Sequence, residues 1–507
     1  MIVRLKHIML LCLAVLGNMA LCKNGQSIVL MEVEGDTLKT NRIELLQADK
    51  WYYIRNENND AQVIVGDVIF KHDSAWMFCD SALLHRTQNS LEAYGHVRIK
   101  ENDTLQLFGD KLQYDGVSKT ATVFDNVRVV NAQTELYTDK LTFDRNTQTA
   151  YYNTGGKIID GDNILLSRFG YYETKRNFFR FNKDVKAYNP KYNLLSDTLH
   201  FDAENNVATA VDTTTMFNDK DTMTYLSGTY DFTSETGKFA NNVYIRYDNH
   251  RLTADSVYYV SQNEYAEGYG HVVITDTSNA VTSWSDYMQF DNKTGYAFIS
   301  GNAIVRSIDN VDTTYLHADT VYTFFDSVIN KIRCYHNVKI VNNVFAGVCD
   351  SLVVRNEDSC ATLYTLPAMW VEDTQITGDS ILVFFGDSTV KYIKIPSCGF
   401  IASKDSLNDI NQVKGNSVDI YFEDNRIDFV DVFGDVETIY FLNGDEGNVG
   451  VNNVTSENAR MMFRSGEIDR FNFYVGVKST LYPLEKAKEE NKRLPGLRWR
   501  IDEKPTR

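Results

Sequence analysis

The stretch Gly109-Asp110-Lys111-Leu112-Gln113-Tyr114-Asp115 recurs along the whole chain. Close copies are Thr138-Asp139-Lys140-Leu141-Thr142-Phe143-Asp144 and Ser196-Asp197-Thr198-Leu199-His200-Phe201-Asp202. Looser copies place an aspartate at positions 49, 80, 255, 286, 319, 350 and 379, and degraded copies place Ser167, Gly228 and Asn416 there. Consecutive copies lie 27 to 37 residues apart, which gives about 13 repeats of roughly 30 residues. Such a period predicts a repeat architecture, in which each unit buries its apolar side against its neighbours.

Each repeat has the pattern of β-strands. After the aspartate, apolar residues alternate with polar ones, as in Leu112 and Tyr114, and such alternation is typical of a strand with one buried face. A polar turn and a strand of small residues follow, and then a second alternating strand such as Gly95-His96-Val97-Arg98-Ile99. Three short strands or two long bent ones fit each repeat. Helical periodicity is missing until the end of the chain, so the sequence predicts an all-β fold.

Composition agrees with this fold and restricts the partners. The 507 residues include 30 Tyr and 28 Phe, and aromatic residues favour pleated, half-buried surfaces. Lys and Arg total 51 against 68 Asp and Glu, a net charge of −17, and no stretch before the extreme C-terminus concentrates positive charge. We therefore expect no nucleic-acid partner.

The N-terminus has the features of an export signal. Arg4 and Lys6 precede the apolar run 8–17, and small residues lead to Cys22. This predicts a signal peptide over residues 1–22 and a periplasmic protein. Acylation of Cys22 is an alternative, which the bulky Leu21 disfavours. No later run approaches the roughly 20 apolar residues of a membrane helix, so we expect at most peripheral membrane contact.

No catalytic, cofactor or metal motif stands out. Because Ser167, Gly228 and Asn416 replace the repeated aspartate, a structural role in turns fits it better than ligation or proton transfer. His96 and His271 occupy a position where other repeats carry Asn, which also indicates a turn residue. The five cysteines after residue 22 have irregular spacing, with no zinc or disulfide pattern. We expect no enzyme activity, no cofactor and no bound metal.

The region from Ile43 to Val130 resembles the OstA/LptA family, the periplasmic β-jellyroll proteins of lipopolysaccharide transport. The residues that carry the resemblance are Ala48-Asp49-Lys50-Trp51-Tyr52-Tyr53, Gly66-Asp67-Val68-Ile69-Phe70, Cys79-Asp80-Ser81-Ala82-Leu83, Gly95-His96-Val97-Arg98-Ile99 and Gly109-Asp110-Lys111-Leu112-Gln113-Tyr114. The repeat pattern is clearest over residues 43–355. The chain is about three times as long as single-domain members and lacks room for the membrane barrel of the related LptD, so it looks like an extended form.

The resemblance implies an elongated, V-shaped β-jellyroll of two stacked, mostly antiparallel sheets. Its interior would be an apolar groove for the acyl chains of lipopolysaccharide or a related glycolipid, and its open edges would pair with other transport proteins. The residues that would line the groove are Leu112, Tyr114, Leu141, Phe143, Leu199, Phe201, Val257, Tyr259, Met288, Phe290, Leu352 and Val354. From periodicity alone a dry core is the better interpretation of this apolar stripe, because most such stripes are packing. The resemblance favours the groove.

The predicted organisation is a signal peptide at 1–22, N-terminal repeats at 23–250, continuing repeats at 251–400, longer divergent repeats at 401–482 and a charged tail at 483–507. We expect the tail to contain one short helix near 485–493 and to be mobile or docked on a partner surface. The leading hypothesis is a periplasmic lipid conduit. The alternatives are a structural β-solenoid, such as an adhesin or scaffold, and a carbohydrate-active enzyme whose acidic or aromatic side chains converge in a cleft.

Overall fold

The computed structural model describes residues 44–506, apart from short gaps at 57–58, 73–74, 86–87, 102–104, 132–133, 189, 191–192, 220, 261, 263–264, 292, 309–311, 326–329, 356, 387–389, 406, 445–446 and 465–466. The predicted signal peptide lies outside the described residues. The chain divides into two compact units: unit 1 comprises residues 1–248 and 255–264, and unit 2 comprises residues 249–254 and 265–507. Strand β20 (His250–Val260) has residues in both units.

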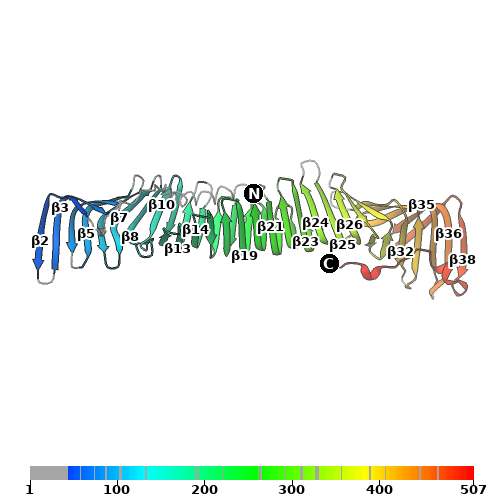
Figure 1. Ribbon diagram of the computed structural model, residues 1–507. Coiled ribbons are helices and arrows are strands. Elements are labelled where there is room, and N and C mark those ends of the chain that lie inside the picture. Colours follow the sequence, from blue (N-terminus) through cyan, green and yellow to red (C-terminus); the bar gives the residue numbers. More distant parts are fainter. Residues whose placement is uncertain are drawn as a thin grey trace, which may run out of the picture. The chain divides into compact units, whose positions relative to one another are not determined.

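Unit 1 consists of antiparallel strands (Figure 1). They are β1 (Glu44–Gln47), β2 (Lys50–Asn56), β3 (Asn59–His72), β4 (Ala75–His85), β5 (Ser90–Glu101), β6 (Leu105–Asp115), β7 (Thr120–Asn131), β8 (Thr134–Asp144), β9 (Thr149–Tyr152), β10 (Gly156–Asp160), β11 (Asn163–Ser167), β12 (Phe169–Glu173), β13 (Phe178–Tyr188), β14 (Asn193–Asp202), β15 (Val207–Ala210), β16 (Thr214–Phe217), β17 (Asp221–Tyr225), β18 (Ser227–Asp231) and β19 (Thr236–Tyr247).

Unit 2 continues the same pattern and adds short helices at its end. Its strands and helices are β21 (Tyr265–Asp276), β22 (Val281–Asp291), β23 (Tyr296–Ile308), β24 (Thr313–Phe325), β25 (Asn330–Val341), β26 (Ala346–Arg355), β27 (Cys360–Tyr364), β28 (Ala368–Val371), β29 (Thr374–Thr377), β30 (Ser380–Phe385), β31 (Val390–Ile395), β32 (Gly399–Lys404), β33 (Ile410–Gly415), β34 (Ser417–Glu423), β35 (Arg426–Gly444), β36 (Gly447–Arg464), β37 (Glu467–Tyr474), β38 (Lys478–Pro483), η3 (Leu484–Lys486), α2 (Glu489–Lys492) and η4 (Ile501–Glu503). The predicted all-β, antiparallel OstA-like fold is confirmed.

Each long strand bends near its middle, so that its two halves belong to two layers. In β6, residues 111–115 pair with the first half of β5, and residues 105–109 pair with its second half. Where the strand breaks completely, the layers separate: β9 pairs with β12, whereas β10 pairs with β11. We call the half that contains β9 and β12 layer A, and the half that contains β10 and β11 layer B. Most repeats therefore use two long bent strands, one of the two patterns that the sequence allowed.

The inner faces of the two layers share one apolar core. In unit 1, a single cluster joins Ala93, Leu112 and Val123 of layer A to Val97 and Val127 of layer B. The side chains between these along each strand point outward, because strand side chains alternate. The core therefore lies between the layers, as in the V-shaped jellyroll that the resemblance implies.

Each bend is a β-bulge built from two residues with positive φ. Gly95 and His96 have φ of 74° and 42°, and together they face the single residue Asp110 in the ladder between β5 and β6. Similar left-handed pairs occur at further bends, among them Asp125/Asn126, Lys183/Asp184, Gly270/His271, Gly301/Asn302 and His336/Asn337. An extra residue in one strand bends it and raises its twist, so these pairs produce the corner between the layers.

The repeated aspartates hold these bends. Asp80 lies on the neighbouring strand and contacts the Nδ1 atom of His96 at 2.8 Å. Asn126 donates to Asp110 at 2.7 Å, and Asn337 donates to Asp319 at 3.0 Å. These contacts place the repeated aspartates in the bends of long strands rather than in the hairpin turns.

A second set of aspartates forms the hairpin turns. Their Oδ1 atoms accept the backbone N–H groups two and three residues later, as Asp115 does from Val117 and Ser118. The others are Asp144, Asp202, Asp231, Asp276 and Asp291. Burial disfavours the charge of Asp276, but hydrogen bonds from Ser278 and Asn279 outweigh it and lower the pKa of Asp276 to about 2.

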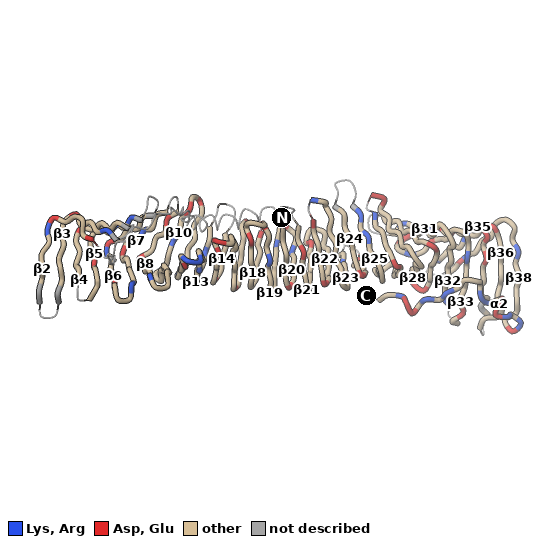
Figure 2. The backbone as a smooth tube through the Cα atoms, viewed as in Figure 1, with Lys and Arg blue, Asp and Glu red and all other residues tan. Residues whose placement is uncertain are grey.

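The C-terminal tail docks on unit 2. The structure has two separate turns, η3 and α2, where the sequence suggested one helix. Figure 1 shows the tail turning back from β38 beneath β32, and Leu494 and Leu497 are both buried there. Charged residues of both signs follow one another along it (Figure 2). The docked alternative of the sequence prediction therefore applies, with this chain's own sheet as the surface.

Replacing Gly95 by Ala should destabilise the bend between β4 and β6. A Cβ atom at Gly95 would lie 2.2 Å from the Oδ2 atom of Asp80, and the φ of 74° already disfavours a side chain. We expect a loss of about 1 to 3 kcal/mol in local stability, measured by hydrogen exchange of β4 and β5. Gly161→Ala is the control, because Gly161 has φ 54° but open space, and should cost about 1 kcal/mol. Equal losses would contradict the role of Asp80.

The bond between His96 and Asp80 should make this bend weakly pH-dependent. The hydrogen bond and the charge of Asp80 raise the pKa of His96 above its ordinary 6.5. A raised histidine pKa stabilises the fold fully below pH 6.5, and that stabilisation is lost as the pH rises through the folded-state value. We expect the loss of local stability caused by His96→Asn, measured by hydrogen exchange of β4 and β5, to be larger at about pH 5.5 than at about pH 8.5. In an Asp80→Asn background this loss should not change with pH.

Candidate functional site

The twelve residues of the predicted stripe all lie on strands, in layer A after the bend. Seven are buried, namely Leu112, Leu199, Phe201, Val257, Tyr259, Met288 and Leu352. Five are half-buried, namely Tyr114, Leu141, Phe143, Phe290 and Val354. The stripe therefore contains both closed and partly open parts.

The first repeats of unit 1 have a partly open interior. Tyr114 and Leu141 of layer A and Ile99 and Leu107 of layer B pack against the buried cluster but remain half-buried. This second wall was not among the predicted lining residues. The alternation of Val97 with Ile99 in the sequence was the signal that could have found it.

Further along unit 1 the interior is a dry aromatic core. Phe201 is fully buried, and its ring lies 6.3 Å from that of Phe179, which stacks on Tyr172 at 4.3 Å. Tyr230 is also fully buried. Close packing of this kind leaves no room for a ligand. At Phe201, the dry-core interpretation describes the structure.

The interior of the later part of unit 2 is equally closed. The inward side chains of β30, β31 and β34 are fully buried, and they are Ile381, Val383, Ile393, Ile395, Val418 and Ile420. Among the described residues of unit 1, the half-buried positions of the stripe are therefore Tyr114, Leu141 and Phe143, on β6 and β8.

The described residues contain no cluster of the kind that holds a metal ion. No group of three or more His, Cys, Asp or Glu side chains converges in the described part of the chain. Glu267 accepts hydrogen bonds from Tyr265, Tyr269 and Tyr287, the last at 3.0 Å. Burial opposes its charge, yet these bonds lower the pKa of Glu267, so it is an ionised acceptor. A glycosidase would need a second carboxylate as proton donor beside such an acceptor.

The five described cysteines are free thiols, and four of them are buried. Burial raises the pKa of Cys79, Cys334 and Cys349 to about 12, and Cys360 is buried as well. A buried, protonated thiol behaves as a small apolar side chain. Cys398 is exposed, and all five thiols are unpaired.

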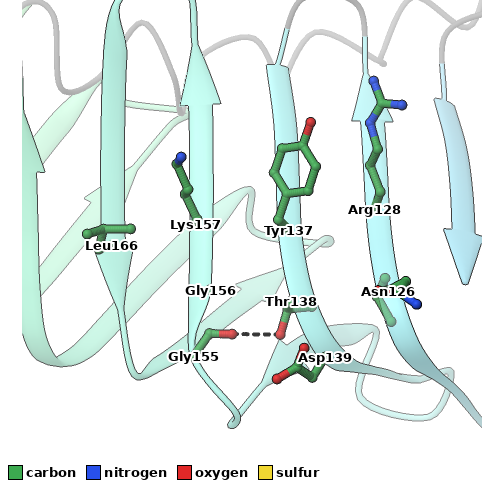
Figure 3. Close-up of a pocket in the computed structure, with 10 residues that line it drawn as sticks. Asn126, Arg128, Tyr137, Thr138, Asp139, Gly155, Gly156, Lys157 and Leu166 are labelled. Atoms are coloured by element: carbon green, nitrogen blue, oxygen red, sulfur yellow. Dashed lines mark hydrogen bonds between the residues drawn. The ribbon is translucent and has the colours of Figure 1, made fainter.

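A depression of about 570 Å³ opens on the outer side of layer B in unit 1 (Figure 3). Arg128, Tyr137 and Lys157 project from three neighbouring strands along one wall, and Asp139 lies at the other. Thr138 donates to the carbonyl of Gly155 at 2.7 Å across its floor. Its lining mixes charged side chains with apolar ones such as Val127 and Leu166, which distinguishes this depression from the apolar interior.

Two buried glutamines position the tail, which sequence analysis did not foresee. Gln375 donates to the carbonyl of Arg498 at 2.8 Å and accepts from the N–H of Arg500 at 2.7 Å. Gln412 does the same with Lys492 and Leu494, at 2.9 and 2.7 Å. Each side-chain amide thus bonds the backbone of the tail as the backbone of a neighbouring strand would do. The tail side chains pack on Phe400, Ala402, Ile439, Phe441 and Val451.

In unit 2 we call the strands β28, β29, β32 and β33 layer B, and the tail lies on the outer face of this layer. Gly399 and Gly415 point toward Val418 and Val432 of layer A, so they mark the inner face. Ala402 and Gln412 lie at alternating positions and point the other way. The tail therefore covers the outside of the sheet and does not enter the interior.

One comparison with known proteins bears on the chain. Residues 40–197 match the family described as OstA-like protein. This region is OstA-like. The match covers β1 to β13 and the first half of β14, and includes the half-open interior of β5 to β8. The resemblance that the repeated sequence motifs indicated is thereby confirmed. No curated protein shows significant similarity to the chain. Among the described residues, no helix has the length and apolarity needed to span a membrane.

The two parts of the predicted stripe should respond differently to truncation. Phe201→Ala removes a fully buried ring and should cost about 3 to 5 kcal/mol. Phe143→Ala removes a half-buried ring and should cost about 1 to 2 kcal/mol. Hydrogen exchange of β13 to β15 and of β7 to β9 measures the two losses separately, which suits a repeat protein without a single unfolding transition. Equal costs would mean that the OstA-like interior is as closed as the rest.

Proposed function

We propose that this protein is a non-enzymatic periplasmic carrier of lipopolysaccharide or a related glycolipid, with acyl chains in the half-open interior of the OstA-like region. The observation that carries the proposal is the half-buried apolar lining at Tyr114, Leu141 and Phe143, opposite Ile99 and Leu107. The match to the OstA-like family, whose members resemble lipopolysaccharide-transport proteins, supports it.

The physical basis is partition of acyl chains from water into an apolar interior. Each buried CH₂ group contributes about 0.8 kcal/mol and forms no directional bonds, so a chain can slide along the lining without a large barrier. Net direction would come from an upstream energy source. The headgroup would remain outside, where the surface of the acidic chain does not favour phosphate as the principal contact.

The exposed edge of unit 1 supports pairing with another transport protein. Among the described strands, β1 and β2 pair only with β3, so their other edges are free. Trp51 is 56% exposed, and Tyr52, Tyr53 and Ile54 are also exposed. An edge strand with exposed aromatic residues is suited to strand addition by a partner. The predicted signal peptide supports a periplasmic location for this pairing.

A structural solenoid is the second candidate, favoured by the dry core around Phe201. It predicts a sealed interior along both units. The carrier and the solenoid therefore differ at the half-buried positions of β6 and β8.

Photo-crosslinking distinguishes the two candidates. A photoreactive amino acid at Tyr114 or Phe143 should capture lipopolysaccharide in living cells, because both side chains point into the half-open interior. Gln113 lies next to Tyr114 on β6 but points outward, and a crosslinker there should capture none. Capture is measured by immunoblotting the purified adduct for lipopolysaccharide. Absence of capture at Tyr114 and Phe143, or equal capture at Gln113, would overturn the carrier.

A further inference from the structure

The outer face of layer B in unit 1 carries a regular row of cations. Strand pairing aligns Arg98, Arg128, Lys157 and Lys186 across the sheet, with one apolar or aromatic residue between each pair. The row is Ile69, Phe78, Arg98, Phe108, Arg128, Tyr137, Lys157, Leu166, Lys186 and Leu195. The cations lie two strands apart, which corresponds to about 10 Å. They are 29 or 30 residues apart in sequence, so no linear stretch concentrates them.

The neighbouring row on the same face has the same character. Register places Lys71, Trp76 and Lys100 side by side on β3, β4 and β5, and Trp76 is 38% exposed. Arg98 lies over the ring of Phe78 at 5.2 Å, and Lys71 lies over that of Trp76 at 5.4 Å. The aromatic rings therefore hold the cations at the surface without neutralising them.

Some of the acidic groups around this face have local partners, whereas Asp139 lies at the edge of the face beside the depression. Among the described residues, the second row contains two carboxylates: Glu135 pairs with Arg128 at 2.5 Å, and Glu44 lies beside Lys71 in the register of β1 and β3. The aspartates of the bends border the first row, where Asp80 and Asp110 bond to His96 and Asn126. Lys157 and Lys186 are exposed, and neither forms an ion pair in the described part of the chain.

The outer face of layer B in unit 2 is covered by the tail and therefore serves as a comparison for the uncovered face in unit 1. There the residues under the tail are apolar or amide, such as Ala402, Ile439 and Gln412, and they are almost completely buried. In unit 1 the same face keeps lysine, arginine and half-exposed aromatic residues. Its composition is that of a surface whose partner is anionic and hydrated, with an apolar layer beneath.

We propose that the outer face of layer B in unit 1 docks on an anionic lipid bilayer. Lys and Arg attract the lipid headgroups, and Trp76, Phe108, Tyr137 and Leu195 contact the interfacial region, where amphipathic aromatic residues are favoured. The chain is acidic overall, so this local reversal of charge orients the face toward the membrane. The interaction does not depend on whether the interior carries lipid.

Vesicle co-sedimentation of the mature full-length protein tests this docking. Wild type should bind vesicles that contain phosphatidylglycerol, bind vesicles of phosphatidylcholine alone much more weakly, and lose affinity as salt rises. The double variant Lys157→Glu/Lys186→Glu should reduce binding by about tenfold or more. Both side chains are exposed, so the variant should keep the wild-type circular dichroism spectrum and Tm.

A charge-matched control separates this face from general electrostatics. Lys175→Glu/Lys238→Glu makes the same change of net charge at exposed positions of unit 1, in a turn and on β19. This variant should bind within about twofold of wild type. The proposal is overturned if the wild-type protein does not bind phosphatidylglycerol vesicles, including the case in which it binds an acidic protein instead. It is also overturned if the two double variants lose affinity equally.

Discussion

A pair of left-handed residues set between two aspartates is the constraint on which the rest of the structure depends. At Gly95-His96, one aspartate faces the pair across the ladder and another bonds to the histidine ring from the preceding strand. The extra residue forces the corner between the layers. Because the corner falls at the same height in successive strands, the inner faces stay in register, and the apolar residues of both layers meet in one core. A corner shifted by one residue would turn the apolar face outward.

The same backbone encloses interiors of two kinds, and the difference comes from the side chains that fill them. Around β13 and β14, stacked Phe179 and Phe201 occupy the space between the layers. Around β6 to β8, Leu112, Val123 and Val127 are buried, whereas Leu107, Leu141 and Tyr114 beside them remain half-buried. A lipid carrier needs the second kind of interior, whereas stability of a long stack needs the first. Unit 1 contains both, and the half-open part falls within the OstA-like region.

The periodic features could be predicted from sequence, and the non-periodic ones could not. Recurrence of the aspartate and the alternation of Leu112 with Tyr114 gave the strands, the repeat and the inward stripe. The pattern could not show that Phe201 is sealed while Phe143 is half-buried, because exposure depends on the opposite layer. It also could not show that Gln375 holds the backbone of Arg498 and Arg500, since that contact joins residues more than a hundred positions apart without a motif. The cation row was hidden for a related reason, since a spacing of 29 or 30 residues dilutes it in the linear sequence.

The outer face of layer B has the same strand pairing in both units but different side chains: in unit 2 it is covered by the tail, and in unit 1 it is not. A sheet face that is apolar must be covered, and in unit 2 the tail covers it with Leu494 and Leu497, while Gln375 and Gln412 supply the hydrogen bonds that the tail backbone would otherwise lack. A sheet face that is exposed to water is expected to be polar. Exposure to water alone, however, does not explain why aromatic residues stand beside the lysines on this face. Unit 1 has both kinds of residue in alternation, with Trp76 and Tyr137 more than a third exposed. That mixture is costly in bulk water and favourable at a boundary between charge and hydrocarbon, which is why the bilayer surface explains this face better than solvent alone.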